Sequence, residues 1–269
     1  MVTQAVVQAR IAPIYEQADE SSALADEALH GMTVDIMEER PGALCRVRTH
    51  YGYEGFMRTA DLCRDAANHA AWQTAVRCVI DSFAVDVLDA PRVQALRTHR
   101  LTKGCQIVRL DNAGDDWARV RLADGCEGFV RDKLAGAPIP TFAEEGAFRR
   151  AVVATALSYR GVQYRWGGKT PEGIDCSGLC SMAYMLNGIL ICRDARPDDA
   201  FPVRAIEQGC MKPGDLLYFP GHMAMVIGGN RFVHATAVGD GVCVNSMDKT
   251  DEDYRADLAE SLLSVGSVF

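Results

Sequence analysis

An internal repeat in the first half of the chain constrains the fold more than any other feature. The segment RVRTHYGYEGFMR at 46–58 superposes on RVRLADGCEGFVR at 119–131 with a constant offset of 73 residues and eight identities in thirteen positions. The same offset pairs Gly31 with Gly104. Short alternating strands separated by glycine turns are typical of a small β-barrel. We therefore expect this half to contain the same small barrel twice.

Changes in composition divide the chain further. The first copy is expected over residues 1–65 and the second over 79–137, with a linker helix over 66–78 between them. The proline-rich stretch GAPIPTFAEEG then suggests a boundary. The helical pattern RRAVVATALSYRG opens a third domain over 145–269. These segments together predict an α+β protein.

The charge and hydropathy of the chain exclude two classes of partner. A formal net charge of −8 without a dense lysine and arginine block argues against a nucleic acid or an anionic membrane as partner. No run of about eighteen apolar residues occurs, and the N-terminus has no basic segment followed by an apolar one. The ten cysteines lack the spacing of a disulfide framework. We expect a cytoplasmic protein whose cysteines are reduced.

The segment GIDCSGLC at 173–180 combines a possible nucleophile with the start of a helix. Apolar residues recur at helical spacing from Leu179 onward, which places Cys176 on the first turn. Unpaired backbone N–H groups and the helix dipole stabilise a thiolate there, which predicts a lowered pKa. Cys180, one turn later, is expected to pack in the core. Two cysteines without a second Cys or His pair do not make a structural zinc site, so we expect no metal.

A thiolate nucleophile needs a base and a group that orients this base. The third domain contains two histidines, His222 and His234, in the segment GHMAMVIGGNRFVHATA, which is typical of two alternating strands joined by a turn. A three-residue loop at Gly228-Gly229-Asn230 would place both histidines on one face, diagonally adjacent. A two-residue loop would place them on opposite faces. On spacing alone, ordinary sheet histidines are an equally good interpretation.

Five motifs in this domain share their order and spacing with a known family. They are YRWGG (164–168), DCSG (175–178), PGDLLYF (213–219), HMAMVIG (222–228) and FVHATA (232–237). Together they resemble the NlpC family of papain-like cysteine peptidases, which cut bacterial cell-wall peptides. The resemblance implies that Cys176 is the nucleophile and His222 the general base. It also implies that His234 orients His222 and that Tyr164 helps to bind the oxyanion.

The resemblance extends to residues around the nucleophile. It implies that Asp175 and Ser177 help to shape the substrate site. Arg193 and Asp194 match an Arg-Asp pair that follows the catalytic helix and contacts substrate in one subgroup. Trp166 is expected to form a wall of the active-site groove or part of the core. The family chemistry implies no cofactor.

The two repeats resemble bacterial SH3-like domains, in which a strand commonly ends in a Gly-x-x-Gly pattern such as YGYEGFM or DGCEGFV. Two such domains before a catalytic domain resemble the dipeptidyl-peptidase VI type of the family. That type cleaves the γ-D-glutamyl to L-diamino-acid bond of murein tri- or tetrapeptides that have a free N-terminal L-alanine. An acid and a tyrosine of the first domain bind the ammonium group. Tyr53 matches the tyrosine, whereas Ala23 stands where the family most often has Glu, which leaves Asp26 or Glu27 as the acid.

Two other interpretations remain open. A secreted hydrolase would use its SH3-like domains to anchor itself to the cell wall, and an inactive peptidase fold would serve as a peptide-binding module. The complete catalytic set and the missing export signal favour an enzyme of cell-wall peptide recycling.

Overall fold

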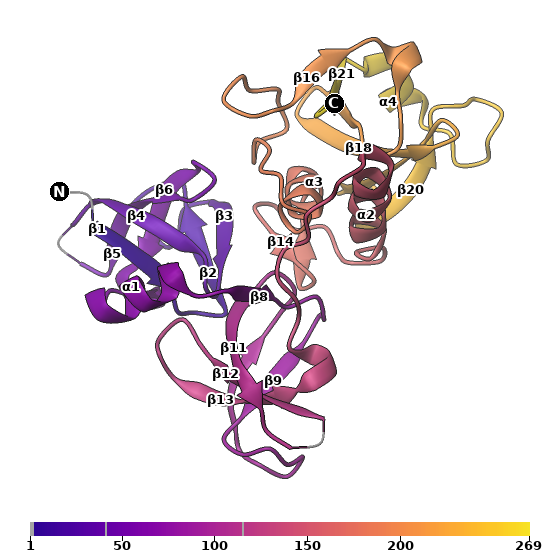
Figure 1. The fold of residues 1–269 in the computed structure, drawn as a ribbon. Coiled ribbons are helices and arrows are strands. Elements are labelled where there is room, and N and C mark those ends of the chain that lie inside the picture. Colours follow the sequence, from indigo (N-terminus) through magenta and orange to yellow (C-terminus); the bar gives the residue numbers. More distant parts are fainter. Residues whose placement is uncertain (1–2, 41, 115) are drawn as a thin grey trace. The chain divides into compact units, whose positions relative to one another are not determined.

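The computed structural model describes residues 3–40, 42–114 and 116–269, and the chain divides into two compact units at residues 139 and 140 (Figure 1). No helix within these described ranges has the length and apolar character needed to cross a bilayer. All ten cysteines lie in the described ranges and carry free thiols.

The first unit contains two antiparallel sheets. The first has the strand order β3-β2-β6-β5-β4-β1-β7, with β1 (Thr3–Val7), β2 (Ile11–Tyr15), β3 (Leu24–Leu29), β4 (Thr33–Glu38), β5 (Leu44–Thr49), β6 (Glu54–Arg58) and β7 (Leu62–Cys63). The second has the order β10-β9-β13-β12-β11-β8, with β8 (Arg77–Val79), β9 (Val85–Leu88), β10 (Arg97–Leu101), β11 (Gln106–Asn112), β12 (Trp117–Arg121) and β13 (Glu127–Arg131). Adding the offset of 73 residues to β1–β6 gives β8–β13 to within one or two residues at each end, which confirms the repeat, whereas β7 has no counterpart among the strands of the second sheet.

The repeated glycines occupy turns that need a left-handed backbone. Gly52 and Gly125 have φ values of +83° and +88°, and Gly31 and Gly104 have values of +87° and +94°. Glycine adopts such angles without the steric cost that a Cβ atom would bring. The sequence identity at these positions therefore reflects a backbone requirement that both copies share.

A short helix, α1 (Ala66–Thr74), connects the two sheets. Its N-cap, Asp65, accepts a hydrogen bond from the Asn68 N–H, which satisfies one of the free donors at the helix start. Trp72 is fully buried and donates its indole N–H to the carbonyl of Gly31 at 3.0 Å. One-turn 3₁₀ helices follow β6 (η1, Thr59–Asp61) and β13 (η2, Asp132–Leu134).

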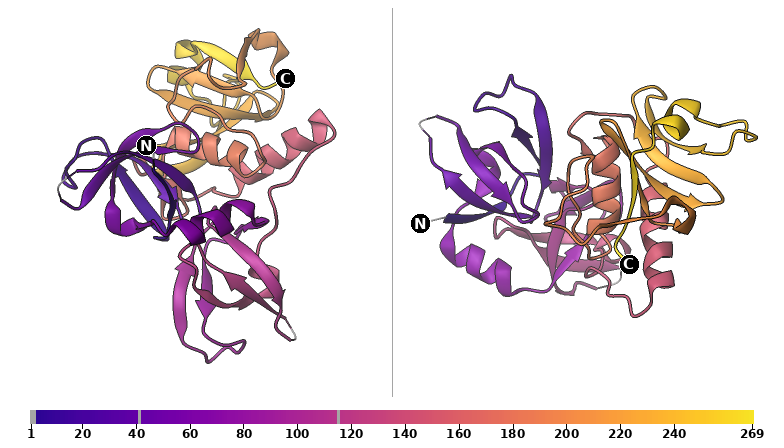
Figure 2. Two further views of the ribbon diagram at one scale, coloured as in Figure 1. Left: turned by 60° about the vertical axis from the view of Figure 1, so that its left-hand side comes forward. Right: turned by 90° about the horizontal axis from the view of Figure 1, so that it is seen from above.

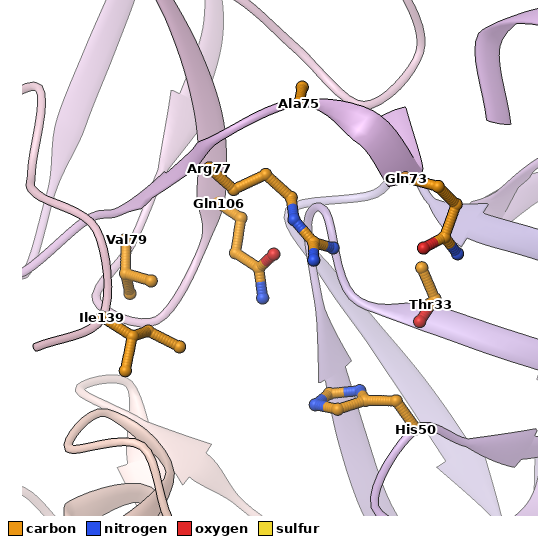
Figure 3. Close-up of a pocket in the computed structure, with 8 residues that line it drawn as sticks. All are labelled: Thr33, His50, Gln73, Ala75, Arg77, Val79, Gln106 and Ile139. Atoms are coloured by element: carbon orange, nitrogen blue, oxygen red, sulfur yellow. The ribbon is translucent and has the colours of Figure 1, made fainter. Parts of the chain in front are cut away.

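A cavity of about 390 Å³ lies within the first unit. Figure 3 shows the side chains of Arg77 and Gln106 pointing into it, opposite Thr33, Gln73 and His50. Its lining includes none of the residues expected to carry out catalysis.

The second unit combines helices with one main sheet. The sheet has the order β16-β21-β17-β18-β19-β20, with β16 (Arg204–Ile206), β17 (Leu216–Phe219), β18 (His222–Gly228), β19 (Arg231–Thr236), β20 (Gly241–Ser246) and β21 (Ser264–Ser267). The other elements are α2 (Glu145–Leu157), the two-stranded sheet of β14 (Lys169–Thr170) and β15 (Gly173–Ile174), α3 (Cys176–Met185), η3 (Gln208–Cys210) and α4 (Ala256–Ser261).

The two faces of this sheet build separate cores. Helices α2 and α3 lie beside the sheet (Figure 2) and pack on the face that carries Met223, Met225 and Val233. Leu258 of α4 packs with Phe219 and other apolar residues of the opposite face. This division follows the alternation of side chains along each strand. It places the first turn of α3 next to the start of β18.

Candidate active site

Cys176 is the first residue of α3, as the sequence predicts. Asp175 caps this helix, because its Oδ1 atom accepts a hydrogen bond of 2.6 Å from the Gly178 N–H. Cys180 is fully buried in the core of the domain, which confirms its packing role. Cys176 therefore lies at the N-terminal end of the helix, next to its backbone N–H groups, whereas Cys180 only packs in the core.

The predicted lowering of the Cys176 pKa is wrong for this structure. Burial is the largest effect and raises the pKa of the thiol, and the nearby Asp175 carboxylate raises it further. Backbone hydrogen bonds at Met223 and Ser177 and the Arg193 guanidinium act in the opposite direction without reversing the shift. Desolvation disfavours the charged form, and here it outweighs the helix N-terminus. The resting side chain of Cys176 is therefore a thiol.

A buried ion pair fixes the residues beside Cys176. Arg193 forms two hydrogen bonds of 3.0 Å, one to each carboxylate oxygen of Asp175. Its Nη1 atom also donates to the Ser177 Oγ atom at 2.7 Å, and the Gly167 N–H donates to Asp175 at 2.8 Å. Asp175 and Ser177, expected to shape the substrate site, therefore have protein partners. Through these contacts they hold the start of α3.

The two histidines lie side by side on the sheet. The Nε2 atom of His222 is 2.8 Å from the Nδ1 atom of His234, and the His234 Nε2 atom is 2.9 Å from the Asn245 Oδ1 atom. Asn245 donates its amide N–H to the Asp253 carbonyl at 3.0 Å, so its oxygen faces His234. This carbonyl contact orients the whole chain of hydrogen bonds.

The direction of these bonds determines which ring nitrogens carry protons. Because the Asn245 oxygen only accepts, His234 must donate from Nε2, which leaves its Nδ1 atom as an acceptor. His222 then donates from Nε2, so the lone pair of its Nδ1 atom is available to take a proton. Asn245 could not be predicted from the sequence, because its contact with His234 depends on the register between β19 and β20.

The turn between β18 and β19 is the shorter of the two loops that the sequence left open. Gly228 pairs with Arg231, so the turn contains two residues, Gly229 and Asn230. A register shift between Val226 and Gly228 inserts one extra residue. This bulge restores the register that a three-residue loop would give. The histidines therefore share a face, as expected, although the bulge rather than the loop length places them there.

Burial keeps the two histidines neutral. It lowers the pKa of His222 to about 4, with His234 as the second cause, and it lowers the pKa of His234 as well. The thiol of Cys176 contacts the backbone of Met223, which follows His222. No hydrogen bond joins Cys176 to His222 among the described residues. A neutral imidazole at the start of β18 can accept a proton as substrate binds.

Tyr164 also belongs to this region. Burial raises the pKa of its hydroxyl to about 12, and the nearby Cys176 and Asp175 raise it as well. The hydroxyl therefore keeps its proton at neutral pH and can donate a hydrogen bond to a developing negative charge.

Two other predicted contact residues lie at the surface of the domain. Trp166 has 63% of its surface exposed, so it is not part of the core. Asp194 is half-exposed and forms an ion pair of 3.6 Å with Arg196. Both side chains are accessible to a peptide.

In the first SH3-like domain the structure pairs an acid with a tyrosine that the sequence motif did not single out. The Tyr51 hydroxyl donates a hydrogen bond of 2.5 Å to the Asp26 carboxylate and lies 3.3 Å from the Glu27 carbonyl. Asp26 and Glu27 are both buried. The backbone N–H of Tyr53 donates to the Thr49 hydroxyl at 3.0 Å. Asp26 is thus a buried carboxylate with a hydroxyl donor, as a buried polar group requires.

Comparisons with known proteins match this architecture. The model of the NlpC/P60 family matches residues 161–257, and that of the bacterial dipeptidyl-peptidase SH3 domain matches residues 14–62. The dipeptidyl-peptidase 6 of Lysinibacillus sphaericus is 44% identical over 98% of this chain and 99% of its own length. The chain belongs to the NlpC/P60 family. It is therefore a hydrolase of the cysteine-peptidase class.

Two further proteins are similar to this NlpC/P60 protein. A γ-D-glutamyl-L-lysine dipeptidyl-peptidase of Bacillus subtilis is 30% identical over 46% of this chain and 43% of its own length. A crystal structure of an NlpC/P60 family protein from Bacillus cereus superposes with a TM-score of 0.81 and covers 98% of both chains, at 19% identity. This second likeness supports the fold, with SH3-like domains before a papain-like catalytic domain.

Proposed function

We propose that this protein hydrolyses the bond between γ-D-glutamate and an L-diamino acid in murein peptides that have a free N-terminal L-alanine. The observation that carries this proposal is the match to dipeptidyl-peptidase 6 over nearly the whole of both chains. The match includes the SH3-like segment as well as the catalytic domain. Peptides with free amino termini are released fragments rather than intact wall, which suits a role in recycling.

Acylation begins with attack of the Cys176 sulfur on the amide carbonyl. His222 takes the thiol proton on Nδ1 as the S–C bond forms, because the thiol is protonated at rest. The Tyr164 hydroxyl and the Cys176 backbone N–H stabilise the oxyanion. His222 then gives the proton to the leaving amine as the C–N bond breaks, which leaves a thioester.

Deacylation uses the same groups with water as the nucleophile. His222 removes a proton from water, the thioester carbonyl becomes a second oxyanion, and the Cys176 sulfur leaves with that proton. His234 and Asn245 keep the His222 ring in one tautomer throughout. No cofactor takes part in these steps.

The amino terminus of the substrate is recognised by the first SH3-like domain. The Asp26 carboxylate supplies the negative charge. The Tyr51 hydroxyl donates a hydrogen bond to this carboxylate and thereby fixes its orientation. Glu27 and Tyr53, which the sequence suggested, are the other candidates for this role. An acetylated amine has no positive charge, so a carboxylate pocket would reject it.

The experiment compares L-Ala-γ-D-Glu-L-Lys with its N-acetylated copy as substrates of the full-length protein. We expect cleavage of the free peptide and at least about a 30-fold loss of kcat/KM on acetylation, since an unpaired buried charge costs at least ~2 kcal/mol. Absence of cleavage of the free peptide, or equal rates for both, would overturn the proposal.

Two matched variants separate the candidate acids. Asp26→Asn should raise KM for the free peptide and leave kcat less affected, because binding rather than chemistry is lost. Glu27→Gln removes the neighbouring buried charge and serves as the control. If only Glu27→Gln raises KM, Glu27 and not Asp26 binds the amine.

A further inference from the structure

The repeat brings three possible metal ligands to a defined place in the second SH3-like domain. The offset of 73 residues maps Asp26 onto His99, Tyr51 onto Asp124 and Tyr53 onto Cys126. In the first copy two of these positions form the hydrogen bond between Tyr51 and Asp26. In the second copy the same positions carry an imidazole, a carboxylate and a thiol.

The three ligand atoms of the second copy converge. One ligand atom from each of His99, Asp124 and Cys126 lies within 4.8 Å of the other two. The His99 Nε2 and Asp124 Oδ2 atoms are 3.5 Å apart. Ligands of a tetrahedral zinc ion at the usual bond lengths are separated by roughly 3.3 to 3.6 Å. The imidazole and the carboxylate thus already have the spacing of a shared ion.

Hydrogen bonds behind the cluster orient two of its ligands. The Thr98 hydroxyl lies 3.2 Å from the Val87 carbonyl, to which it donates, and 3.2 Å from the His99 Nδ1 atom. The hydroxyl oxygen therefore accepts from Nδ1–H, which leaves the lone pair of Nε2 facing Asp124. A hydrogen bond from the other ring nitrogen is the usual support of a metal-binding histidine.

The carboxylate is oriented in the same way. The backbone N–H of Cys126 donates to the Asp124 Oδ1 atom at 2.9 Å, and Oδ2 is the atom next to His99. His99 and Asp124 are half-buried, whereas Cys126 is exposed, so an ion can enter from solvent and retain a water ligand.

We propose that His99, Asp124 and Cys126 bind a transition-metal cation of the zinc class, with water as the fourth ligand. One nitrogen, one oxygen and one sulfur ligand suit Zn²⁺, whereas Mg²⁺ and Ca²⁺ prefer oxygen alone. The thiol loses its proton to solvent as the metal binds. The site belongs to the second SH3-like domain and is independent of the proposed peptidase specificity.

The first test titrates Zn²⁺ into the reduced full-length protein in competition with a chromophoric chelator. We expect one equivalent to bind, and His99→Ala or Cys126→Ser to weaken that binding by at least about 100-fold. Cys176→Ser, Cys210→Ser and His69→Ala are the controls and should bind as the unchanged protein does. Absence of binding, or binding that Cys176→Ser abolishes and His99→Ala leaves intact, would overturn the proposal.

Cobalt gives a second test with a spectroscopic signal. Co²⁺ bound to the protein should show a thiolate-to-metal charge-transfer band that Cys126→Ser removes and Cys210→Ser does not. Thr98→Val should weaken binding by roughly 10-fold, because it removes the support of the His99 ring. A charge-transfer band that persists in Cys126→Ser would place the ion elsewhere and refute the site.

Discussion

The two sides of the catalytic centre are built from opposite kinds of interaction. On the helix side, Asp175 and Arg193 form a buried pair of full charges that holds the first turn of α3. On the sheet side, a chain of neutral groups runs from His222 through His234 to Asn245. Both sides are oriented by hydrogen bonds, yet only one of them can change its protonation without losing a charged partner.

This difference separates the groups that hold the helix start in place from the groups that can transfer a proton. A buried ion pair with two parallel hydrogen bonds is rigid, and a proton taken up by the Asp175 carboxylate would leave the Arg193 guanidinium uncompensated. Neutral imidazoles in a desolvated place can accept a proton and pass it on. In the proposed mechanism, the charged side positions the Cys176 nucleophile and the neutral side activates it.

Removal of the charged side should have the largest effect. Asp175→Ala leaves the Arg193 guanidinium buried without its carboxylate and removes the helix cap. Breaking a buried ion pair costs about 3–5 kcal/mol, to which the cap adds about 1 kcal/mol. Urea unfolding followed by circular dichroism measures this loss.

A neighbouring acid provides the control for this measurement. Asp194→Ala removes an exposed ion pair with Arg196 and should change stability by less than ~1 kcal/mol. The double variant Asp175→Ala with Arg193→Met should be less unstable than the sum of its parts, because no buried charge is left alone. Equal losses in Asp175→Ala and Asp194→Ala would mean that the pair does not hold the helix.

The neutral side should make the free energy of unfolding depend on pH. The pKa of His222 is about 4 in the folded protein and ordinarily about 6.5 in an unfolded chain. Above pH ~6.5 the imidazole is neutral in both states. Between pH ~6.5 and pH ~4 the unfolded chain binds a proton at His222 that the folded protein does not bind. Stability therefore falls as pH falls, by about 3 kcal/mol in total.

Unfolding titrations between pH 7.5 and pH 4, as approximate limits, measure this dependence. His222→Gln has no imidazole and should lose less stability over the same interval. Burial also lowers the pKa of His30 to about 4, which contributes a slope common to both proteins. Identical pH dependence in the two proteins would contradict the desolvation of His222.

The sequence predicted these two sides unequally. The motif around Cys176 and the apolar period after it were enough to predict the start of α3, because a helix cap is a local feature. The sequence predicted the proximity of His222 to His234 only for one of two loop lengths, because this proximity depends on a β-bulge that no residue type indicates. The role of Asn245 was not predicted at all, because its partner His234 lies on another strand. The raised pKa of Cys176 results from burial by distant elements, which local helix chemistry does not include.

Asn245→Ala should reduce activity more than it reduces stability. Without the Asn245 oxygen, His234 is free to adopt the other tautomer, and His222 then loses the acceptor that fixes its Nε2–H. A positioned general base contributes about 100- to 10,000-fold, so partial loss of its orientation should cost roughly 10- to 100-fold in activity. We expect this loss in kcat rather than KM, measured with the free tripeptide.

A conservative variant distinguishes orientation from simple packing. Asn245→Asp restores an acceptor and adds a negative charge, which should recover part of kcat and raise the pKa of the histidine pair. The acid limb of the pH–rate profile should then move to higher pH. An unchanged profile with full activity in Asn245→Ala would show that the amide does not set the tautomer.

The smallest effect on activity is expected for a substitution of Cys243, whose thiol lies near the Asn245 end of the hydrogen-bonded chain His222–His234–Asn245. Its sulfur is 3.4 Å from both the His234 Nε2 atom and the Asn245 Oδ1 atom, whereas the direct His234 to Asn245 contact is 2.9 Å. A thiol is a weak donor and a weak acceptor, so the amide is the stronger partner of the imidazole. Cys243→Ala should therefore change kcat by less than about 3-fold, since a weak neutral bond contributes little. If it lowers kcat as much as Asn245→Ala does, the thiol and not the amide orients His234, and the neutral side of the centre ends at Cys243.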